Sequence, residues 1–193
     1  VDLRRFAAPA LAAAQPETPF VIGWTGTCGN FKYLYGIEKA LYHFLSRHED
    51  AMLRIVADRP PAFTLIPPHK HHFIPWRRST ETAALTTFSV GIMPMTDDAW
   101  TRSKCAYKML QYMAAGVPVI VSPVGMNREV MAHLEGHGLS ATSAGQWNDA
   151  LEFIFRHRDT ALAWGAKGRE VVQKYYSTPV IAAKLAAVFS RYS

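Results

Sequence analysis

Cysteine is nearly absent from the chain, long apolar runs are missing, and basic residues never gather in a block. Only Cys28 and Cys105 occur, too far apart for a C-x-x-C pair, so neither a disulfide framework nor a cysteine zinc site is indicated. No run approaches the roughly 18 to 20 apolar residues of a membrane-spanning helix. No block of about five or six Lys or Arg occurs, which argues against nucleic-acid binding through a basic tail. The cysteine content fits a protein of the reducing cytoplasm.

The composition is that of a folded domain. The chain has 193 residues, of which 49% are hydrophobic and 19% charged, and its formal net charge is +6. The apolar share excludes intrinsic disorder, and the length allows one domain with a sizeable core. The stretch 7–19 is rich in Ala and Pro and has no hydrophobic period. We therefore expect a linker over residues 1–19 and the folded domain over residues 20–193.

Within the domain, short apolar runs alternate with helical patterns. Helices are expected over residues 33–47, 79–88, 104–115 and 128–133 and over most of the chain after residue 147, which gives a helical C-terminal tail. The helix over 104–115 should end at Gly116, because Gly followed by Pro118 is a stop signal. Buried strands are expected at 20–24, 53–57, 73–76, 90–95 and 117–122, with an edge strand at 138–141. This order predicts an α/β fold, a doubly wound, Rossmann-like parallel sheet of about six strands with helices on both faces.

In such a sheet, ligands bind beyond the carboxyl ends of the strands, so the loops there are the candidate site. The loop over 23–30 holds three glycines and two small hydroxyls, which lets backbone N–H groups approach an anion closely. A tight turn alone explains one or two of these glycines but not three. Gly26 and Thr27 are the candidate phosphate contacts, and Lys32 at the start of the next helix adds a positive charge.

A second loop leads into the helix expected over 104–115. Lys104, Lys108 and Gln111 stand at i, i+4 and i+7 and share one helical face. Cations at a helix N-terminus oppose the macrodipole by roughly 0.3 to 1 kcal/mol each, and two like charges add a few tenths more. A helix N-terminus with two ammonium groups suits a phosphate or diphosphate. The alternative is a solvated face with Asp97 and Asp98 as counter-ions.

Three further features are less informative. The loop over 122–127 allows close approach of a ligand, but a plain turn would have the same residues. Trp76, at the end of a strand, suits either base stacking or core packing. His69, His71 and His72 match no zinc pattern, so a solvent-facing loop is expected rather than a metal site. No Ser/His/Asp set stands out, and catalytic residues are not identified.

The longest motif runs over residues 90–127 and contains VGIMPM, Trp100, Lys104-Cys105 and KMLQYMAAGVPVIVSPVGMN. It resembles the donor-binding region of GT-B retaining glycosyltransferases, the group 1 or family 4 class. Residues 1–6 look like the segment that leaves the N-terminal domain of these enzymes, and residues 165–177 look like their closing helices. The resemblance covers nearly the whole chain but only the C-terminal half of a full enzyme.

The resemblance implies that the chain binds a nucleoside-diphosphate sugar. Gln111 takes the place of a Glu that holds the ribose hydroxyls in many members, and its amide can still hydrogen-bond a hydroxyl. Ser103 takes the place of a Glu that faces the sugar, but it brings no charge. The resemblance implies that the donor diphosphate lies at Lys104, Cys105, Ala106 and Lys108.

The class moves a sugar, a hexose in the type implied here, from the donor to an acceptor with retention and typically needs no divalent metal. Fixed ammonium groups would stabilise the charge that develops on the leaving diphosphate. The N-terminal half holds most acceptor contacts, so this chain alone is expected to bind the donor with little or no transfer. Peripheral membrane association is an expectation for the full-length enzyme.

Two other functions stay open. Gly23, Gly26 and Gly29 follow a strand, and Asp58 ends the next one, which is reminiscent of an NAD(P)-binding oxidoreductase domain. The spacing is not G-x-G-x-x-G, however, and Asp58 lies 29 residues after Gly29 where about 20 are expected. The other possibility is a nucleotide-binding module without catalytic activity.

Overall fold

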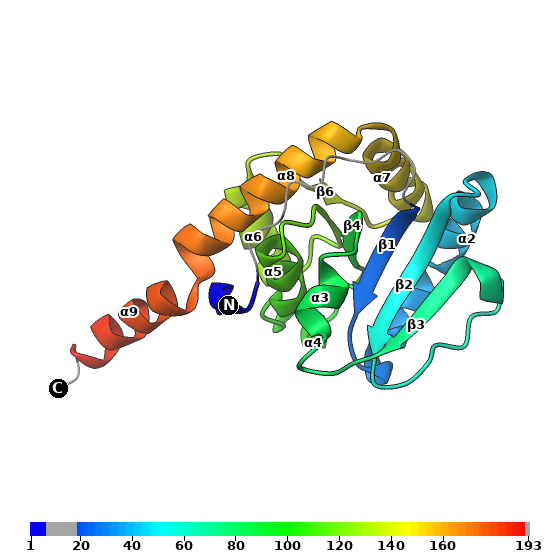
Figure 1. Cartoon of the computed structure of the whole chain (residues 1–193). Helices are drawn as coiled ribbons and strands as arrows, with labels where there is room; N and C mark the ends of the chain where they lie inside the picture. Colours follow the sequence, from blue (N-terminus) through cyan, green and yellow to red (C-terminus); the bar gives the residue numbers. More distant parts are fainter. Residues whose placement is uncertain (7–18, 192–193) are drawn as a thin grey trace.

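The computed structural model describes residues 1–6 and 19–191, and in them a six-stranded parallel sheet lies between two layers of helices (Figure 1). The strand order is β3-β2-β1-β4-β5-β6, so the chain builds outwards from β1 in one direction and then in the other. This is the expected doubly wound sheet, and its switch point lies between β1 and β4. The strands are β1 (Phe20–Thr25), β2 (Ala51–Ala57), β3 (His71–Pro75), β4 (Val90–Met93), β5 (Val119–Val121) and β6 (Leu139–Ser140).

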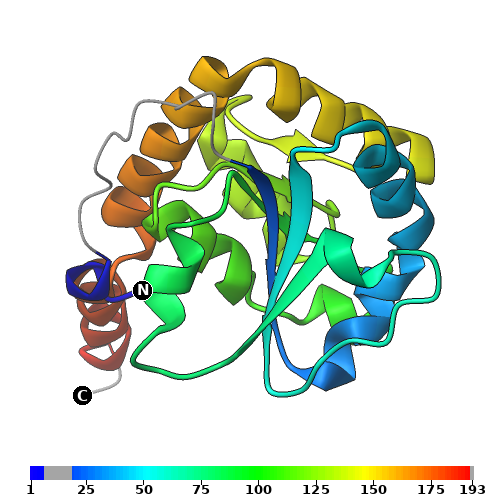
Figure 2. The same cartoon turned by 45° about the vertical axis from the view of Figure 1, so that its right-hand side comes forward.

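The helices cover both faces of the sheet (Figure 2). Short turns of helix are η1 (Leu3–Arg5), η2 (Cys28–Asn30), η3 (Pro68–Lys70) and the π-helical η4 (Val172–Tyr176). The α-helices are α1 (Phe31–Gly36), α2 (Glu38–Arg47), α3 (Glu81–Leu85), α4 (Ala99–Arg102), α5 (Tyr107–Ala114), α6 (Met126–Leu134), α7 (Ala144–Arg156), α8 (Arg158–Val171) and α9 (Thr178–Phe189).

Two hydrophobic clusters form the core, one on each face of the sheet. Along β1, Phe20 and Ile22 belong to the cluster with α1, α2 and α7, and Val21 belongs to the cluster with α3, α5 and α6. This alternation follows from the period of a strand, in which successive side chains point to opposite faces. Ala161 and Val171 show that α8 spans both clusters.

The carboxyl ends of β1 and β4 are fixed by Tyr112 of α5. Tyr112 is fully buried, and its hydroxyl accepts the Thr25 N–H at 2.8 Å and donates to the Ile92 carbonyl at 3.4 Å. Its ring packs on Gly91, where a Cβ atom would lie 2.5 Å from the ring. Burial raises the pKa of Tyr112 above its ordinary value of 10, which strengthens the preference for the protonated hydroxyl that donates to Ile92. The sheet edge at the switch point is therefore rigidly attached to α5.

Several expected boundaries are wrong, although the elements exist. The helix expected over 33–47 is two helices, α1 and α2, which meet at Ile37. The helix expected over 104–115 begins only at Tyr107, because Ala106 adopts a left-handed conformation with φ 52°. Its end is confirmed: Gly116, at φ 73°, donates its N–H to the Met113 carbonyl at 3.0 Å. The helix expected over 79–88 is the shorter α3.

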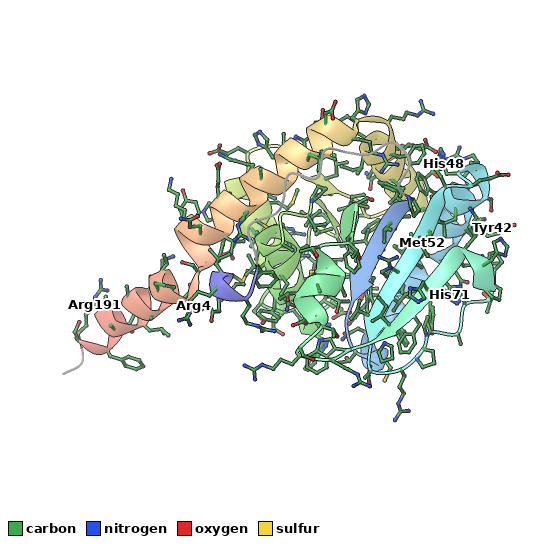
Figure 3. The ribbon with its side chains drawn as sticks, viewed as in Figure 1. Arg4, Tyr42, His48, Met52, His71 and Arg191 are labelled. Carbon is green, nitrogen blue, oxygen red and sulfur yellow. The ribbon has the colours of Figure 1, made fainter. Side chains whose placement is uncertain are left out.

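The histidine stretch is not a loop throughout. His71 and His72 open the edge strand β3 and pair with Leu53 and Arg54 of β2 (Figure 3). His69 belongs to η3. Strand pairing with β2 takes precedence here over the polar character of the residues.

Residues 1–6 pack against the end of the helical layer. Phe6 is buried, the amino group of Val1 donates to the Tyr176 carbonyl at 2.7 Å, and Thr178 donates to the Val1 carbonyl at 2.9 Å. Most of the expected linker, residues 7–18, lies outside the described residues. The start of the chain therefore lies beside η4 and α9 (Figure 1).

Helix α9 projects from the body at the far end of α8 (Figures 1 and 2). None of its residues is buried, and Ile181, Leu185 and Val188 are 37%, 52% and 49% exposed. In the described part of the chain, no helix combines the length and apolar character needed to span a bilayer.

Candidate functional site

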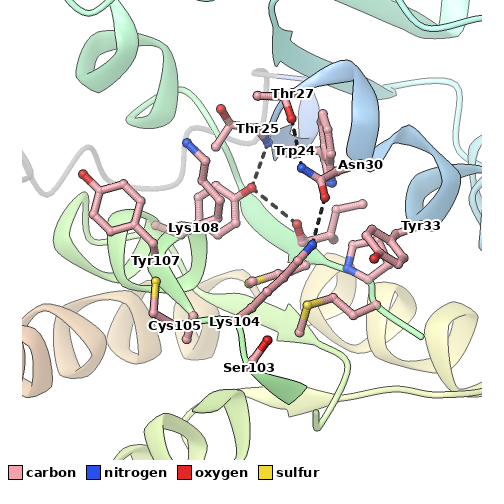
Figure 4. A pocket seen from close by; sticks show the side chains of 17 residues that line it. Trp24, Thr25, Thr27, Asn30, Tyr33, Ser103, Lys104, Cys105, Tyr107 and Lys108 are labelled. Atoms are coloured by element: carbon pink, nitrogen blue, oxygen red, sulfur yellow. Dashed lines mark hydrogen bonds between the residues drawn. The ribbon is translucent and has the colours of Figure 1, made fainter. Parts of the chain in front are cut away.

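A cavity of about 350 Å³ opens at the carboxyl edge of the sheet, next to the switch point (Figure 4). One wall is the loop after β1 and the other is the segment between α4 and α5. Seven of the sequence-predicted site residues line it: Gly26, Thr27, Ser103, Lys104, Cys105, Ala106 and Lys108. Lys32, Gln111 and Trp76 do not line it.

Lys104 lies in the loop before α5 and not on the helix. Its ammonium donates to Asn30 Oδ1 at 2.9 Å and lies 4.6 Å from the centre of the Tyr33 ring. Lys104 therefore does not oppose the macrodipole of α5, and the prediction that Lys104, Lys108 and Gln111 share one helical face is wrong. The lysine nevertheless lines the cavity, because Asn30 of η2 and Tyr33 of α1 hold it there (Figure 4).

The first turn of α5 lines the cavity together with its cap residue. Ala106 has no side-chain oxygen that could accept a hydrogen bond from the first N–H groups of α5. These groups are available to an anion, and Lys108 lies in the same turn. Cys105 is an exposed free thiol, and Cys28 in the facing loop is also free.

Lys108 and Trp76 meet at a residue that the sequence does not indicate, Glu81, and Gln111 joins this group through Lys108. The Lys108 ammonium donates to Gln111 Oε1 at 3.0 Å and lies 3.5 Å from Glu81 Oε1. The Trp76 indole N–H donates to Glu81 Oε1 at 2.9 Å. Trp76 is 45% exposed, so simple core packing does not describe it. An acidic residue in the first turn of a helix is ordinary, and no feature of the sequence marks Glu81.

The pKa values of this group reflect burial and charge together. Burial opposes ionisation of Glu81, but the hydrogen bond from the Trp76 indole and the charge of Lys108 act against it, and the pKa of the Glu81 carboxyl is lowered. Burial lowers the pKa of Lys108, and Glu81 opposes this effect. The surroundings thus favour the ionised form of Glu81, whereas burial disfavours the charged form of Lys108 and Glu81 offsets that effect only in part.

Ser103 and Lys32 have weaker connections to the cavity. The Ser103 hydroxyl lines it and donates to the Trp100 carbonyl at 2.8 Å. Lys32 is exposed, with its ammonium 5.1 Å from the centre of the Tyr33 ring. Lys32 therefore adds positive potential near the cavity without lining it.

Asp97 and Asp98 do not neutralise the lysines. Asp97 pairs with Arg102 at 2.6 Å and with Arg128 at 3.4 Å. Asp98 caps α4 by accepting the Thr101 N–H at 2.9 Å. The alternative in which these aspartates are counter-ions of Lys104 and Lys108 is therefore wrong.

The loop over 122–127 is a structural turn. Ser122 Oγ accepts the Met95 N–H at 3.0 Å, and the buried Asn127 donates to the Ser122 carbonyl at 2.9 Å. Gly125, at φ 52°, lies where a Cβ atom would meet the Arg102 carbonyl. No residue of this loop lines the cavity.

The three glycines of the first loop have different roles. Gly23 packs on Phe88 within β1, Gly26 lines the cavity beside Trp24, and a Cβ atom at Gly29 would meet no other group within 4 Å. Asp58 accepts the Cys28 N–H at 2.6 Å, which lowers its pKa. Asp58 thus holds the loop itself. Within the described residues, no group of three or more His, Cys, Asp or Glu could hold a metal ion.

A family model described as glycosyl transferases group 1 matches residues 19–157. Among solved structures, the C-terminal domain of LpcC, a glycosyl transferase group 1 family protein from Francisella tularensis, is 16% identical with a TM-score of 0.70, covering 92% of this chain and 99% of that one. Sucrose-phosphate synthase from Thermosynechococcus elongatus is 20% identical with a TM-score of 0.72, covering 100% and 51%. No curated protein sequence matches the chain.

HepE from Anabaena, solved in complex with UDP and glucose, is 12% identical with a TM-score of 0.77, covering 99% of this chain and 55% of HepE. At these identities, the solved structures show the fold alone. The chain spans about half of the length of the synthase and of HepE. The fold is therefore that of a C-terminal domain, as the match to LpcC illustrates.

Proposed function

The chain belongs to group 1 of the glycosyl transferases, and we propose that it is the half that binds a nucleoside-diphosphate sugar. The GT-B fold and the family support a transferase, in which this chain presents the donor to an acceptor held mainly by an N-terminal half. The proposal includes transfer with retention, a hexosyl group as the transferred sugar, and no requirement for a divalent metal.

One observation carries the proposal. Lys104 and Lys108 come from different settings, a loop and a helix, yet both line one cavity that also contains Gly26, Thr27 and the start of α5. Ammonium groups and free backbone N–H groups that converge on one cavity suit a diphosphate. That HepE has been solved with UDP and with UDP-glucose supports the same class of ligand.

The chemistry follows from the charge of the site. Cleavage of a sugar–diphosphate bond leaves negative charge on the diphosphate, and fixed positive groups lower the barrier by stabilising that charge. Lys104, Lys108 and the N–H groups of α5 would act there, with Lys32 adding to the potential. Gln111 and Trp76 would lie towards the ribose and base, and Ser103 towards the sugar.

The test is a calorimetric titration of the 193-residue chain with UDP, GDP, ADP and NADH. We expect at least one nucleoside diphosphate to bind, and to bind more tightly than NADH. Tighter binding of NADH would instead favour the dinucleotide-binding alternative, and no binding by any diphosphate would contradict the proposal.

A second assay separates a transferase from a nucleotide-binding module. We expect the chain alone to give little or no sugar transfer and the full-length enzyme to give transfer. We also propose that the full-length enzyme associates peripherally with membranes, which a vesicle sedimentation assay with and without anionic lipid would test. Sugar transfer that never appears in the full-length protein would favour the non-catalytic module.

A further inference from the structure

Glu81 is a buried carboxylate paired with Lys108, a residue of the cavity wall, and three other segments meet at it. It is 3% exposed. Trp76 approaches it from the loop after β3, Lys108 approaches from α5, and Arg5 of η1 lies 3.4 Å from its second oxygen. These contacts join residues that are 5, 27 and 76 positions away from Glu81 in the sequence.

Stability alone does not account for a charge at this place. A buried carboxylate loses its hydration, and the attraction of its partners repays that loss only in part, so a buried ion pair adds little net stability. Apolar residues would fill the same space at least as well. The buried charge therefore points to a role in fixing its partners.

The partner with a direct place in the cavity is Lys108. Its ammonium has three N–H groups, and two acceptors, Gln111 Oε1 at 3.0 Å and Glu81 Oε1 at 3.5 Å, take up two of them. The side chain is 29% exposed and lines the cavity. One N–H group thus remains for a ligand, in a direction set by the other two. The second partner, Trp76, is held by its indole N–H while much of its ring stays exposed.

We propose that Glu81 is the positioning residue of the nucleotide site, fixing the cavity-lining Lys108 ammonium and holding the Trp76 indole next to that ammonium. This inference rests on the proposed function, because it assigns the residue that orders the same site. Glu81 acts through Lys108 and Trp76 and does not itself touch the ligand.

The charge of Glu81 also matters for the protonation of Lys108. The groups that face Lys108 are Glu81 from α3, Gln111 and the Tyr107 ring from α5, and Lys104 across the cavity, while Arg5 shares Glu81 from the far side. Glu81 is the negative charge in this set. Burial already lowers the pKa of Lys108, so loss of the carboxylate lowers it further.

The test compares Glu81→Gln with Glu38→Gln. Glu38 is also a buried carboxylate, but it holds the 64–66 loop through the N–H groups of Thr64 and Leu65, both at 2.7 Å, and does not line the cavity. Affinity for UDP, GDP and ADP is measured by calorimetry between about pH 7 and about pH 9.5, with folding checked by circular dichroism.

We expect the wild type and Glu38→Gln to bind their preferred diphosphate similarly across this range. Glu81→Gln should bind about tenfold more weakly near neutral pH and lose a further severalfold as pH rises, because Lys108 then loses its proton. The double variant Glu81→Gln/Lys108→Arg should lose the added pH dependence, because a guanidinium stays charged.

An affinity of Glu81→Gln that follows Glu38→Gln at every pH would overturn the inference while leaving the proposed function intact. If the wild type binds no diphosphate, the proposed function itself is wrong and the inference falls with it. Should Glu81→Gln not fold, Glu81→Asp keeps the charge on a shorter side chain. It should bind about threefold more weakly at every pH, and unchanged affinity would overturn the positioning role.

Discussion

Two lysines four positions apart reach the cavity by different routes. Lys104 is held in a loop by Asn30 and the Tyr33 ring. Lys108 is held on α5 by Gln111 and Glu81. Their removal should therefore affect ligand binding similarly but the stability of the fold differently.

We expect Lys104→Ala and Lys108→Ala each to weaken binding of a nucleoside diphosphate by about 1.5–3 kcal/mol, the range for a hydrogen bond to a charged group. Lys108→Ala should also lower the free energy of unfolding, because the buried Glu81 loses a partner. Calorimetry and urea unfolding measure the two effects. The control is Lys39→Ala, an exposed lysine of α2 that does not line the cavity. Unchanged affinity in both lysine variants would remove the diphosphate from this cavity.

The sequence located part of this site and missed the rest for a physical reason. The loops at the carboxyl ends of the strands pointed to Gly26, Thr27 and Lys104, because the edge of a parallel sheet brings such loops together. The sequence does not indicate Asn30 or Glu81 as site residues, because their contacts are with Lys104 and Lys108, which lie 74 and 27 positions away. Such contacts follow from the packing of whole elements and leave no local pattern.

Among the elements, apolar runs in the sequence predict the positions of the strands well, but the first residues of the helices are predicted less accurately. The strands β1 and β5 are buried throughout, as expected for a sheet covered on both faces, whereas β2 contains the half-buried Arg54. The sequence predicts the start of α5 too early, because Lys104, Cys105 and Ala106 fit a helical pattern. The left-handed conformation of Ala106 breaks it, and a non-glycine residue gives no warning of that.

The contact between β4 and α5 is close enough to test. Gly91→Ala should lower the free energy of unfolding by about 1–3 kcal/mol, because the added methyl group would overlap the buried Tyr112 ring. Gly36→Ala is the control, since a Cβ atom there meets no other group within 4 Å. Urea unfolding measures both. Equal stability of the two variants would mean that β4 and α5 separate more easily than their packing indicates.

The Asp98 cap of α4 should make the stability of the fold depend on pH in the acidic range. Hydrogen bonds from the Thr96 hydroxyl and the Thr101 N–H lower the pKa of Asp98 to about 2. Because the pKa of Asp98 is lower in the folded state, its carboxylate stabilises the fold at pH values above its ordinary pKa of 3.8. This stabilisation is lost as the pH falls towards 2. Asn also caps helices but does not titrate in this range.

We therefore expect Asp98→Asn to melt at a lower temperature than the wild type near pH 7 and the difference to shrink between about pH 4 and about pH 2. Differential scanning calorimetry at several pH values measures this. A difference that stays constant with pH would show that the Asp98 charge adds nothing to the cap.

At the scale of the whole molecule, α9 contributes little to the core. None of its residues is buried, whereas Val171, Val172 and Tyr176 just before it are. Removal of residues 180–193 should change the melting temperature by less than about 2 °C, and nucleotide affinity should not change. Removal of residues 171–193 should lower the melting temperature by more than about 8 °C, because those buried side chains are lost. A large loss of stability in the shorter truncation would assign α9 to the core.

The switch point divides the cavity between the two halves of the sheet. Thr27 and Asn30 come from the half that contains β1–β3, and Lys104 and Lys108 come from the half that contains β4–β6. A refolding intermediate in which only β1, β2 and β3 have paired has no second wall and cannot capture a nucleotide. Recovery of nucleotide binding during refolding would therefore report the moment at which the later strands have joined the sheet.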